Sequence, residues 1–243
     1  MNNIELWLGD CLELMKNIPD KSIDMILADL PYGYKRNKWD FIIDPDQLFI
    51  QYRRIIKPNR AICIFAKNPL GSELIVKNKD IYKYEWIWDK HIPRGFATAR
   101  YQPMNKHEQI LIFGLGKLNY YPIKEKRDKP IKYKNYSKKK DSVYEINNEY
   151  NNISLSNISY DKNPTTLITG KWEANKGKFH PTQKPVSLME YMITTYTKEG
   201  EVVLDNCVGG GSTLIGCKNT NRKGIGIEKD KKYFDITMQR LSE

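Results

Sequence analysis

Residues 23–33 read IDMILADLPYG, and the rest of the chain is best understood from this stretch. Its first six residues are mainly apolar, and turn-forming residues follow them. Such a run is typical of a strand that is buried on both faces of a parallel sheet. Asp29 would then lie at the carboxyl end of the strand, where open α/β sheets bind their ligands. We therefore expect a ligand site at this strand end.

The residues after Asp29 restrict the backbone. Pro31 fixes its own φ and holds Leu30 in an extended conformation, whereas Gly33 allows the chain to turn away. The Asp29 carboxylate, the Leu30 carbonyl and the Tyr32 ring would share one rigid platform. Two hydrogen-bond acceptors beside an aromatic face suit the exocyclic amine of a planar base. The alternative is an ordinary strand-to-loop turn with a surface tyrosine.

The composition indicates a basic protein with a sizeable core. The 243 residues suit one α/β domain with an insertion, or two small domains. The formal net charge is +11 and the lysines cluster, which favours nucleic acid as a partner. The four cysteines form no CxxC pair, so neither a disulfide framework nor a metal site is expected. Since the sequence has no signal peptide and no long apolar run, we expect a cytoplasmic protein without a membrane partner.

Strand and helix patterns alternate over residues 1–116. We expect strands at 4–9, 23–29, 61–66, 84–88 and 109–114, and helices at 11–18 and 45–57. Asp10, with Glu13 three residues later, resembles a capping box, but Asp10 could equally contact a ligand at the strand end. The segment 90–108 is expected to be a polar loop with cations and aromatics that could line a substrate cleft.

The alternation stops between residues 117 and 178, where Lys, Tyr and Asn dominate. The segment is too long for an ordinary loop, so it is either disordered or functional. Its tyrosines and isoleucines allow a small β-rich insert, whose cations could neutralise phosphates and whose tyrosines could stack on bases. We favour an insert that contacts nucleic acid.

Residues 179–243 resume the alternation and include a glycine-rich turn. A strand, a turn at 209–211 and the start of a helix are expected over 202–213. The next strand ends in Glu228, which could accept hydrogen bonds from both hydroxyls of a ribose. The turn matches neither G-x-G-x-x-G nor GxxxxGK[ST], so a nicotinamide dinucleotide and ATP hydrolysis are disfavoured. The pattern favours another nucleoside cofactor.

The order of these motifs resembles the β-group of amino-DNA methyltransferases, a circularly permuted family that uses S-adenosylmethionine. In that family a catalytic motif, usually D-P-P-Y, comes first, a target-recognition insert follows, and a cofactor turn, usually D-P-F-x-G-S-G-T, comes near the C-terminus. Here the same succession reads DLPYG at 29–33, the lysine-rich insert, HPTQKP at 180–185 and DNCVGGGST at 205–213. The resemblance covers nearly the whole chain outside the insert.

The resemblance implies an α/β, Rossmann-like methyltransferase fold, circularly permuted, whose mostly parallel sheet has one antiparallel strand. A target-recognition insert at 117–178 would separate two parts of the catalytic domain, 1–116 and 179–243. The implied activity is site-specific methylation of double-stranded DNA by base flipping. An acid at the start of D-x-P-Y resembles the adenine-N6 members more than the cytosine-N4 members. Adenine N6 is therefore expected; cytosine N4, an RNA or protein substrate, and an inactive DNA-binding relative are the alternatives.

The resemblance also implies roles for single residues. The catalytic residues would be Asp29, Leu30, Pro31 and Tyr32. Those implied to bind S-adenosylmethionine are Asp10, Cys11, Thr182, Lys184, Asp205, Gly209, Gly211 and Glu228. Those expected to hold the DNA backbone are Lys35, Arg36, Lys38, Arg94, Arg100, Lys138 and Lys139. Relatives with this permutation are often dimeric, so a homodimer is a further expectation.

Four positions depart from the family's pattern. Leu30 replaces the first proline of the catalytic motif, but only a backbone carbonyl is needed there, so the chemistry should survive. Asn206 and Cys207 replace a proline and a phenylalanine, which leaves less apolar surface beside the cofactor. Gly210 replaces a serine and should loosen the turn.

Overall fold

The computed structural model describes residues 4–32, 42–132, 158–169 and 183–243. The chain divides into two compact units, one made of Met1–Tyr121 with Thr166–Glu243 and the other of Pro122–Thr165. In the smaller unit, β6 (Glu125–Lys132) and β7 (Ile158–Lys162) form an antiparallel pair. The larger unit holds the main sheet and all the helices that the structure describes.

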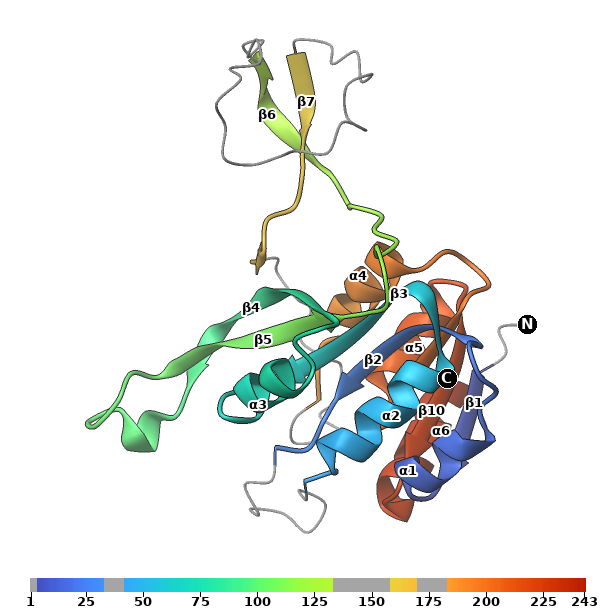
Figure 1. Ribbon diagram of the computed structural model, residues 1–243. Helices are drawn as coiled ribbons and strands as arrows, with labels where there is room; N and C mark the ends of the chain where they lie inside the picture. The colour runs from blue at the N-terminus through green and yellow to red at the C-terminus, as the bar shows by residue number, and fades with distance from the viewer. Residues whose placement is uncertain (1–3, 33–41, 133–157, 170–182) are drawn as a thin grey trace. The chain divides into compact units, whose positions relative to one another are not determined.

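Eight strands form the main sheet in the order β1-β10-β9-β2-β3-β5-β4-β8 (Figure 1). Their bounds are β1 Ile4–Leu8, β2 Ile23–Asp29, β3 Ile56–Ala66, β4 Tyr82–Arg94, β5 Asn105–Phe113, β8 Leu167–Ile168, β9 Val202–Asp205 and β10 Lys223–Glu228. β5 pairs antiparallel with both β3 and β4, and the other described pairs of this sheet are parallel. This confirms the expected mostly parallel sheet with one antiparallel strand.

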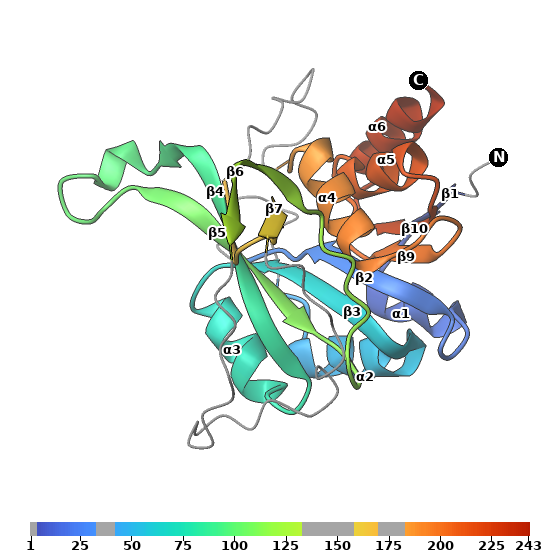
Figure 2. The same cartoon turned by 90° about the horizontal axis from the view of Figure 1, so that it is seen from above.

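Helices cover both faces of the sheet (Figure 2). One face carries α1 (Cys11–Leu14), α2 (Pro45–Ile55) and α3 (Leu70–Lys77); the other carries α4 (Val186–Tyr196) and α5 (Ser212–Asn219), and α6 (Lys231–Ser242) packs beside α5. A hydrophobic core lies on each face of the sheet, and β2 contributes to both. Ile26 and Ala28 pack on the face covered by α1, α2 and α3, whereas Met25 and Leu27 pack on the face covered by α4 and α5. This two-residue alternation explains why the whole stretch is apolar.

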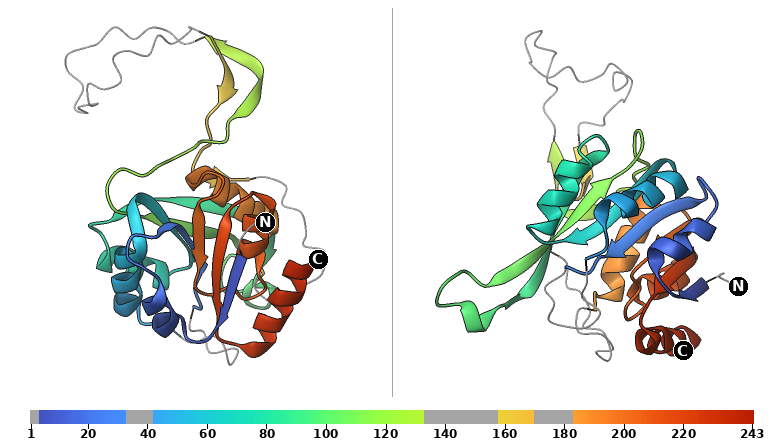
Figure 3. Two further views of the ribbon diagram at one scale, coloured as in Figure 1. Left: turned by 90° about the vertical axis from the view of Figure 1, so that its right-hand side faces the viewer. Right: turned by 60° about the horizontal axis from the view of Figure 1, so that its bottom comes forward.

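The two parts of the chain meet inside the sheet. β9 pairs with β2 through Met25 opposite Val203 and Ile26 opposite Leu204. Segments from opposite ends of the chain, coloured blue and red to orange, therefore lie side by side in Figure 3. The early strand that ends in Asp29 and the late strand before the glycine turn are therefore neighbours in the sheet.

A buried carboxylate strengthens this junction near the start of β2. Asp24 is 2% exposed and accepts a hydrogen bond from the backbone N–H of Val202 at 3.0 Å. It also pairs with Lys57 Nζ at 2.9 Å and Arg60 Nη2 at 3.1 Å. Asp24 thus joins β9 to both β2 and β3. The sequence did not predict this role, because Asp24 only interrupts an apolar run.

Two expected elements differ in the structure. The helix expected to reach residue 57 ends at Ile55, and β3 begins at Ile56 and includes Pro58. Proline is tolerated there because the pairing of β2 with β3 is irregular between Ile56 and Ala61. The segment 90–108 is not a polar loop. β4 and β5 continue through much of it, so it forms the far part of a long hairpin (Figure 1).

Replacing Asp24 with alanine should lower the free energy of unfolding by about 2–3 kcal/mol, because it removes charged hydrogen bonds in a buried place. Urea denaturation followed by circular dichroism measures this change. The matched control is Asp20→Ala, which removes an exposed partner of Arg54 and should cost less than about 1 kcal/mol. Equal losses for the two variants would contradict the role given to Asp24.

Candidate active site

Three acids predicted from the sequence lie along one edge of the sheet. β10, β9 and β2 are parallel neighbours, so Glu228, Asp205 and Asp29 end adjacent strands. The chain leaves β9 towards β10 on one side, but leaves β2 towards β3 on the other. Ligands of open α/β sheets bind beside a switch point of this kind. The arrangement makes this edge the candidate active site.

Asp29 is held by two side chains. Lys184 Nζ donates to its Oδ2 at 2.6 Å, and the Tyr32 hydroxyl donates to its Oδ1 at 3.3 Å. Burial raises the pKa of Asp29, and the Lys184 ammonium group opposes that rise. Lys184 was expected beside the cofactor's methionine; the structure places its ammonium group on the carboxylate proposed to be catalytic.

A second acid, Glu108 of β5, belongs to the same cluster and was not predicted from the sequence. Lys184 Nζ lies 3.2 Å from its Oε2, while Lys67 Nζ and Lys90 Nζ lie 3.1 and 3.4 Å from its Oε1. Burial raises the pKa of Glu108, but the three ammonium groups outweigh burial and lower it to about 2. The only sequence signal was an acid at the start of the apolar run QILIF.

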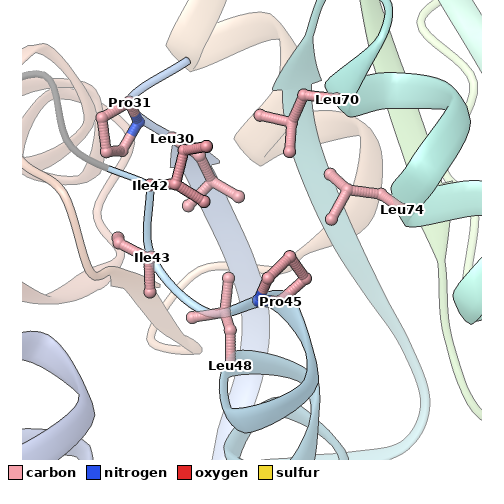
Figure 4. A pocket seen from close by; sticks show the side chains of 8 residues that line it. All are labelled: Leu30, Pro31, Ile42, Ile43, Pro45, Leu48, Leu70 and Leu74. Carbon is pink, nitrogen blue, oxygen red and sulfur yellow. The ribbon is translucent and has the colours of Figure 1, made fainter. Parts of the chain in front are cut away.

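Leu30 and Pro31 turn away from these charges. They line a small apolar hollow together with Ile42, Ile43, Pro45, Leu48, Leu70 and Leu74 (Figure 4). Leu30 is 4% exposed and belongs to the core between α2 and α3. The packing explains how leucine can occupy a position where the resembling family usually has proline. None of the lining side chains is polar, so the hollow provides apolar packing for Leu30 and Pro31.

The glycine turn after β9 is held against the end of β10. Gly209 and Gly211 have φ values of 52° and 81°, a region that favours glycine. A Cβ atom on Gly211 would lie 2.8 Å from the Thr237 side chain of α6. The Gly209 N–H donates to Glu228 Oε2 at 2.8 Å, and the Asp230 N–H donates to Oε1 at 2.8 Å. Each Glu228 oxygen keeps a further lone pair for a ligand hydroxyl.

Asp205 is buried at the end of β9. The Cys207 N–H donates to its Oδ1 at 2.9 Å, and Thr213 is a further hydrogen-bond partner. Burial raises the pKa of Asp205 to about 7. Among the residues that the structure describes, no lysine or arginine forms an ion pair with Asp205. The site thus has a buried carboxylate that a cationic ligand group could neutralise.

Asp10 is the N-cap of α1, which is one of the two roles that the sequence left open for it. Its side chain accepts from the Leu12 N–H at 3.0 Å and also pairs with Lys229 Nζ at 3.0 Å. The Gly9 N–H donates to the Glu228 carbonyl at 2.9 Å, which brings the end of β1 to the same edge. The ligand contact of Asp10 stays a prediction.

The unusual residues of the turn have partners of their own. The Tyr52 hydroxyl of α2 donates to Asn206 Oδ1 at 2.5 Å inside the protein. The Cys207 thiol beside Cys11 lowers the pKa of Cys11. These contacts attach the turn to α1 and α2 where the family pattern has a proline and a phenylalanine.

The residues expected to bind DNA fall into two groups. Arg94 ends β4, Arg100 follows the short helix at 96–98, and both are exposed on the β4–β5 hairpin. No acidic residue occurs between Lys90 and His107 of this hairpin. Lys35, Arg36, Lys38, Lys138 and Lys139 lie outside the described residues, as does Thr182 of the cofactor set.

Comparison with known proteins decides the family. Residues 23–239 match the family N6_N4_Mtase, described as DNA methylase, which is most of the chain. The chain belongs to this family. It is therefore an S-adenosylmethionine-dependent DNA methyltransferase, as the resemblance implied.

Individual relatives agree with this assignment. The type II methyltransferase M.HinfI of Haemophilus influenzae is 29% identical, over 97% of this chain and 67% of the relative. The solved M1.HpyAVI–SAM complex has a TM-score of 0.66 and 24% identity, and covers 99% of this chain and all of that one. The cytosine-N4-specific PvuII DNA methyltransferase has a TM-score of 0.69 and 15% identity, and covers 99% of this chain and 87% of that one. These two structures establish the fold.

The site of this DNA methylase fits its cofactor. S-Adenosylmethionine carries an α-ammonium group on its methionine end, and the buried Asp205 carboxylate offers that group a counter-charge. A side chain on Gly211 would clash with Thr237 of α6, so glycine allows the turn to pack closely against that helix. Glu228, two strands from Asp29, offers acceptors for the ribose.

Two absences hold for the part of the chain that the structure describes. None of its helices is both long and apolar enough to span a bilayer. It also includes no group of three or more His, Cys, Asp or Glu that could hold a metal ion.

Replacing Asp205 with asparagine should raise the stability of the cofactor-free protein at high pH and weaken its binding of S-adenosylmethionine. In the folded protein the pKa of Asp205 is about 7, above its ordinary value near 3.8, so its contribution to stability is full below pH 4 and is lost as pH rises to 7. Without cofactor, Asp205→Asn should therefore unfold at a higher temperature than the unchanged protein at pH 8, with no difference near pH 4. The dissociation constant of S-adenosylmethionine should rise roughly 10- to 100-fold, because a charged hydrogen bond is lost.

Thermal denaturation and isothermal titration calorimetry measure these two effects. Asp235→Asn is the control, since Asp235 is an exposed partner of Lys231 and should change neither. Unchanged cofactor affinity in Asp205→Asn would remove Asp205 from the cofactor site.

Proposed function

We propose that this DNA methylase transfers a methyl group to the exocyclic N6 of adenine at a specific sequence in duplex DNA. The observation that carries the proposal is the Asp29 carboxylate at the switch point, one strand away from the glycine turn. An acid begins the motif D-x-P-Y, which is the form that resembles the adenine-N6 members. Pro31 favours an extended backbone at Leu30, whose carbonyl follows this acid directly in the chain.

The proposed chemistry depends on two acceptors. An aromatic amine is a weak nucleophile because its lone pair is delocalised into the ring. The Asp29 carboxylate and the Leu30 carbonyl would accept hydrogen bonds from its two hydrogens, which draws the nitrogen towards tetrahedral geometry and localises the pair. When bound, the cofactor would supply a sulfonium methyl group to this nitrogen and leave as a thioether, and the amine would lose one of its hydrogens as a proton to solvent. The residues thus act mainly by orientation.

Burial disfavours the negative charge of Asp29, so the ionised carboxylate needs a positively charged partner. An ionised carboxylate is a better acceptor than a neutral one. Lys184 supplies a positive charge at 2.6 Å, which favours the ionised form against the cost of burial. We assign Lys184 a role on the catalytic carboxylate in addition to the cofactor role implied by its motif.

The target base has to leave the duplex to reach Asp29. Extrusion costs a few kcal/mol, and stacking on Tyr32 could return about 1–3 kcal/mol of this. Lys67 Nζ lies 5.5 Å from the centre of the Tyr32 ring and would add positive charge near the base and its phosphates. The cofactor roles of Asp10, Cys11, Thr182, Gly209, Gly211 and Glu228 are part of the same proposal.

The insert at 117–178 is proposed to recognise the target sequence. Two of its described strands, β6 and β7, carry an excess of lysines over acids, which suits contact with phosphates. We also propose that the protein works on the nucleoid and as a homodimer; analytical ultracentrifugation tests the second point.

Cytosine N4 is the second candidate target. The family name, N6_N4_Mtase, refers to both positions, and the cytosine-N4-specific PvuII enzyme shares the fold. The fold therefore does not discriminate between the two bases. Analysis of modified nucleosides does, because N6-methyladenine and N4-methylcytosine differ in mass and retention.

Replacing Asp29 with alanine should lower methyl transfer by at least about 100-fold, since a preorganised acceptor is lost. The affinity for S-adenosylmethionine should stay nearly unchanged. Transfer of tritiated methyl groups to DNA, RNA and protein acceptors, followed by mass spectrometry of nucleosides, measures both rate and product. Asp80→Ala, which removes an exposed acid paired with Arg53, is the control.

The possible outcomes are distinct. Wild-type turnover in Asp29→Ala would remove Asp29 from the mechanism. Label in RNA or protein alone would favour another substrate class, and DNA binding without cofactor uptake in the unchanged protein would indicate an inactive relative.

Arg94 and Arg100 are proposed to contact DNA phosphates. Replacing either with glutamine should weaken DNA binding for all sequences and reduce the slope of log K against log salt by about 0.9. Fluorescence anisotropy at several salt concentrations measures the slope. Unchanged slopes in both variants would show that the β4–β5 hairpin does not contact the phosphate backbone of the DNA.

A further inference from the structure

Five charged side chains form one connected cluster at the edge of the sheet. Asp29 pairs with Lys184, Lys184 pairs with Glu108, and Glu108 pairs with Lys67 and Lys90. The distances lie between 2.6 and 3.4 Å. The side chains of Lys184 and Glu108 are only 7% and 9% exposed. The cluster therefore lies mostly inside the protein.

The sheet register explains why Glu108 reaches Asp29. Asp29 of β2 lies opposite Phe65 of β3, which lies opposite Ile110 of β5. Because β5 is antiparallel, Glu108 comes before Ile110 in sequence but extends beyond it at the edge where β2 ends. Side chains two residues apart share a face, so Glu108 lies on the face of Ile110, which is the face covered by α4. Lys184 precedes α4 and meets both acids there.

Stability alone does not account for such a cluster. Apolar side chains of similar volume usually stabilise a protein as well as a buried ion pair does. The strand ends here are surrounded by apolar residues, and Lys184 Nζ even lies 5.0 Å from the centre of the Phe65 ring. Since the cluster ends on the proposed catalytic carboxylate, a role in setting up that carboxylate is the simpler explanation.

We propose that Glu108 is a positioning residue for methyl transfer, which holds the Lys184 ammonium group in the place from which it donates to Asp29 Oδ2. With Oδ2 occupied, Oδ1 is the atom that faces the target amine, beside the Tyr32 hydroxyl. Lys67 and Lys90 hold Glu108 from the end of β3 and from β4. The inference rests on the proposed role of Asp29.

Glu108 and Lys184 act on the charge of Asp29 in opposite directions. The groups that face Asp29 are Lys184, Glu108 and Tyr32, and the Asp205 carboxylate lies at the end of the neighbouring β9. The negative charge of Glu108 raises the pKa of Asp29, whereas Lys184 lowers it. Removing Glu108 should therefore lower this pKa, and removing Lys184 should raise it.

The test compares Glu108→Gln, which keeps the shape of the side chain, with Lys184→Gln, which removes the ammonium charge. In Glu108→Gln, kcat should fall roughly 10- to 100-fold through misplacement of Asp29. The acid limb of its kcat–pH profile should move to lower pH, and that of Lys184→Gln to higher pH. Calorimetry should give the Glu108→Gln variant nearly the same affinity for S-adenosylmethionine as the unchanged protein, because Glu108 acts on Asp29 and not on the cofactor.

Two further variants separate positioning from folding. Glu108→Asp keeps the charge but shortens the side chain, so its acid limb should stay near that of the unchanged protein while kcat partly recovers relative to Glu108→Gln. Glu201→Gln removes a carboxylate paired with Arg60 at the opposite end of β9 and should alter neither kcat nor the limb. Thermal denaturation identifies any variant that does not fold.

The results distinguish this inference from the proposed function. Acid limbs that move in the same direction, or a Glu108→Gln variant with unchanged kcat, would overturn the role of Glu108. Wild-type turnover in Asp29→Ala would instead overturn the role of Asp29 itself. Acid limbs that move in opposite directions, with intact cofactor binding, would support the positioning role. A shift caused by loss of packing alone would not depend on the sign of the charge that was removed.

Discussion

The parallel pairing of β2 with β9 is the constraint on which the site depends. Only two residue pairs join these strands directly, and Asp24 adds a hydrogen bond to the start of β9. Because the strands are parallel, their carboxyl ends reach the same edge. The Asp29 carboxylate and the glycine turn are thereby neighbours, although about three quarters of the chain separates them in sequence. A circularly permuted order of motifs can build one site for this reason.

Electrostatics then divides the edge into two parts. On the β2 side, Lys184 balances the buried charge of Asp29, and Glu108 in turn balances Lys184. On the β9 side, Asp205 forms no ion pair within the described part of the chain, and its pKa is about 7. A buried charge is costly without a partner. The first part is therefore complete in the protein alone, while the second suits a cationic group that the ligand brings.

Local patterns predicted most elements that carry the site. The apolar run at 23–28, with the turn residues after Asp29, and the run at 223–228 each indicated a strand ending in an acid, and both strands exist. Where local rules failed, tertiary pairing was the reason. Residues 90–94 and 105–108 are polar, yet the two strands extend through them because each supplies the other's hydrogen bonds. Pro58 was expected to follow a helix, but an irregular strand accommodates it.

The sequence by itself determined the order of motifs, the alternation that buries β2 on both faces, and the glycines that permit a tight turn, because these depend on residues close together in the chain. It also indicated the family, since three motifs in a permuted order are specific. Only the tertiary structure decided which charges meet. Glu108 reaches Lys184 because β5 runs against its neighbours, and Lys184 reaches Asp29 because α4 covers that face. Contacts of this kind depend on strand direction and register, which no local pattern specifies.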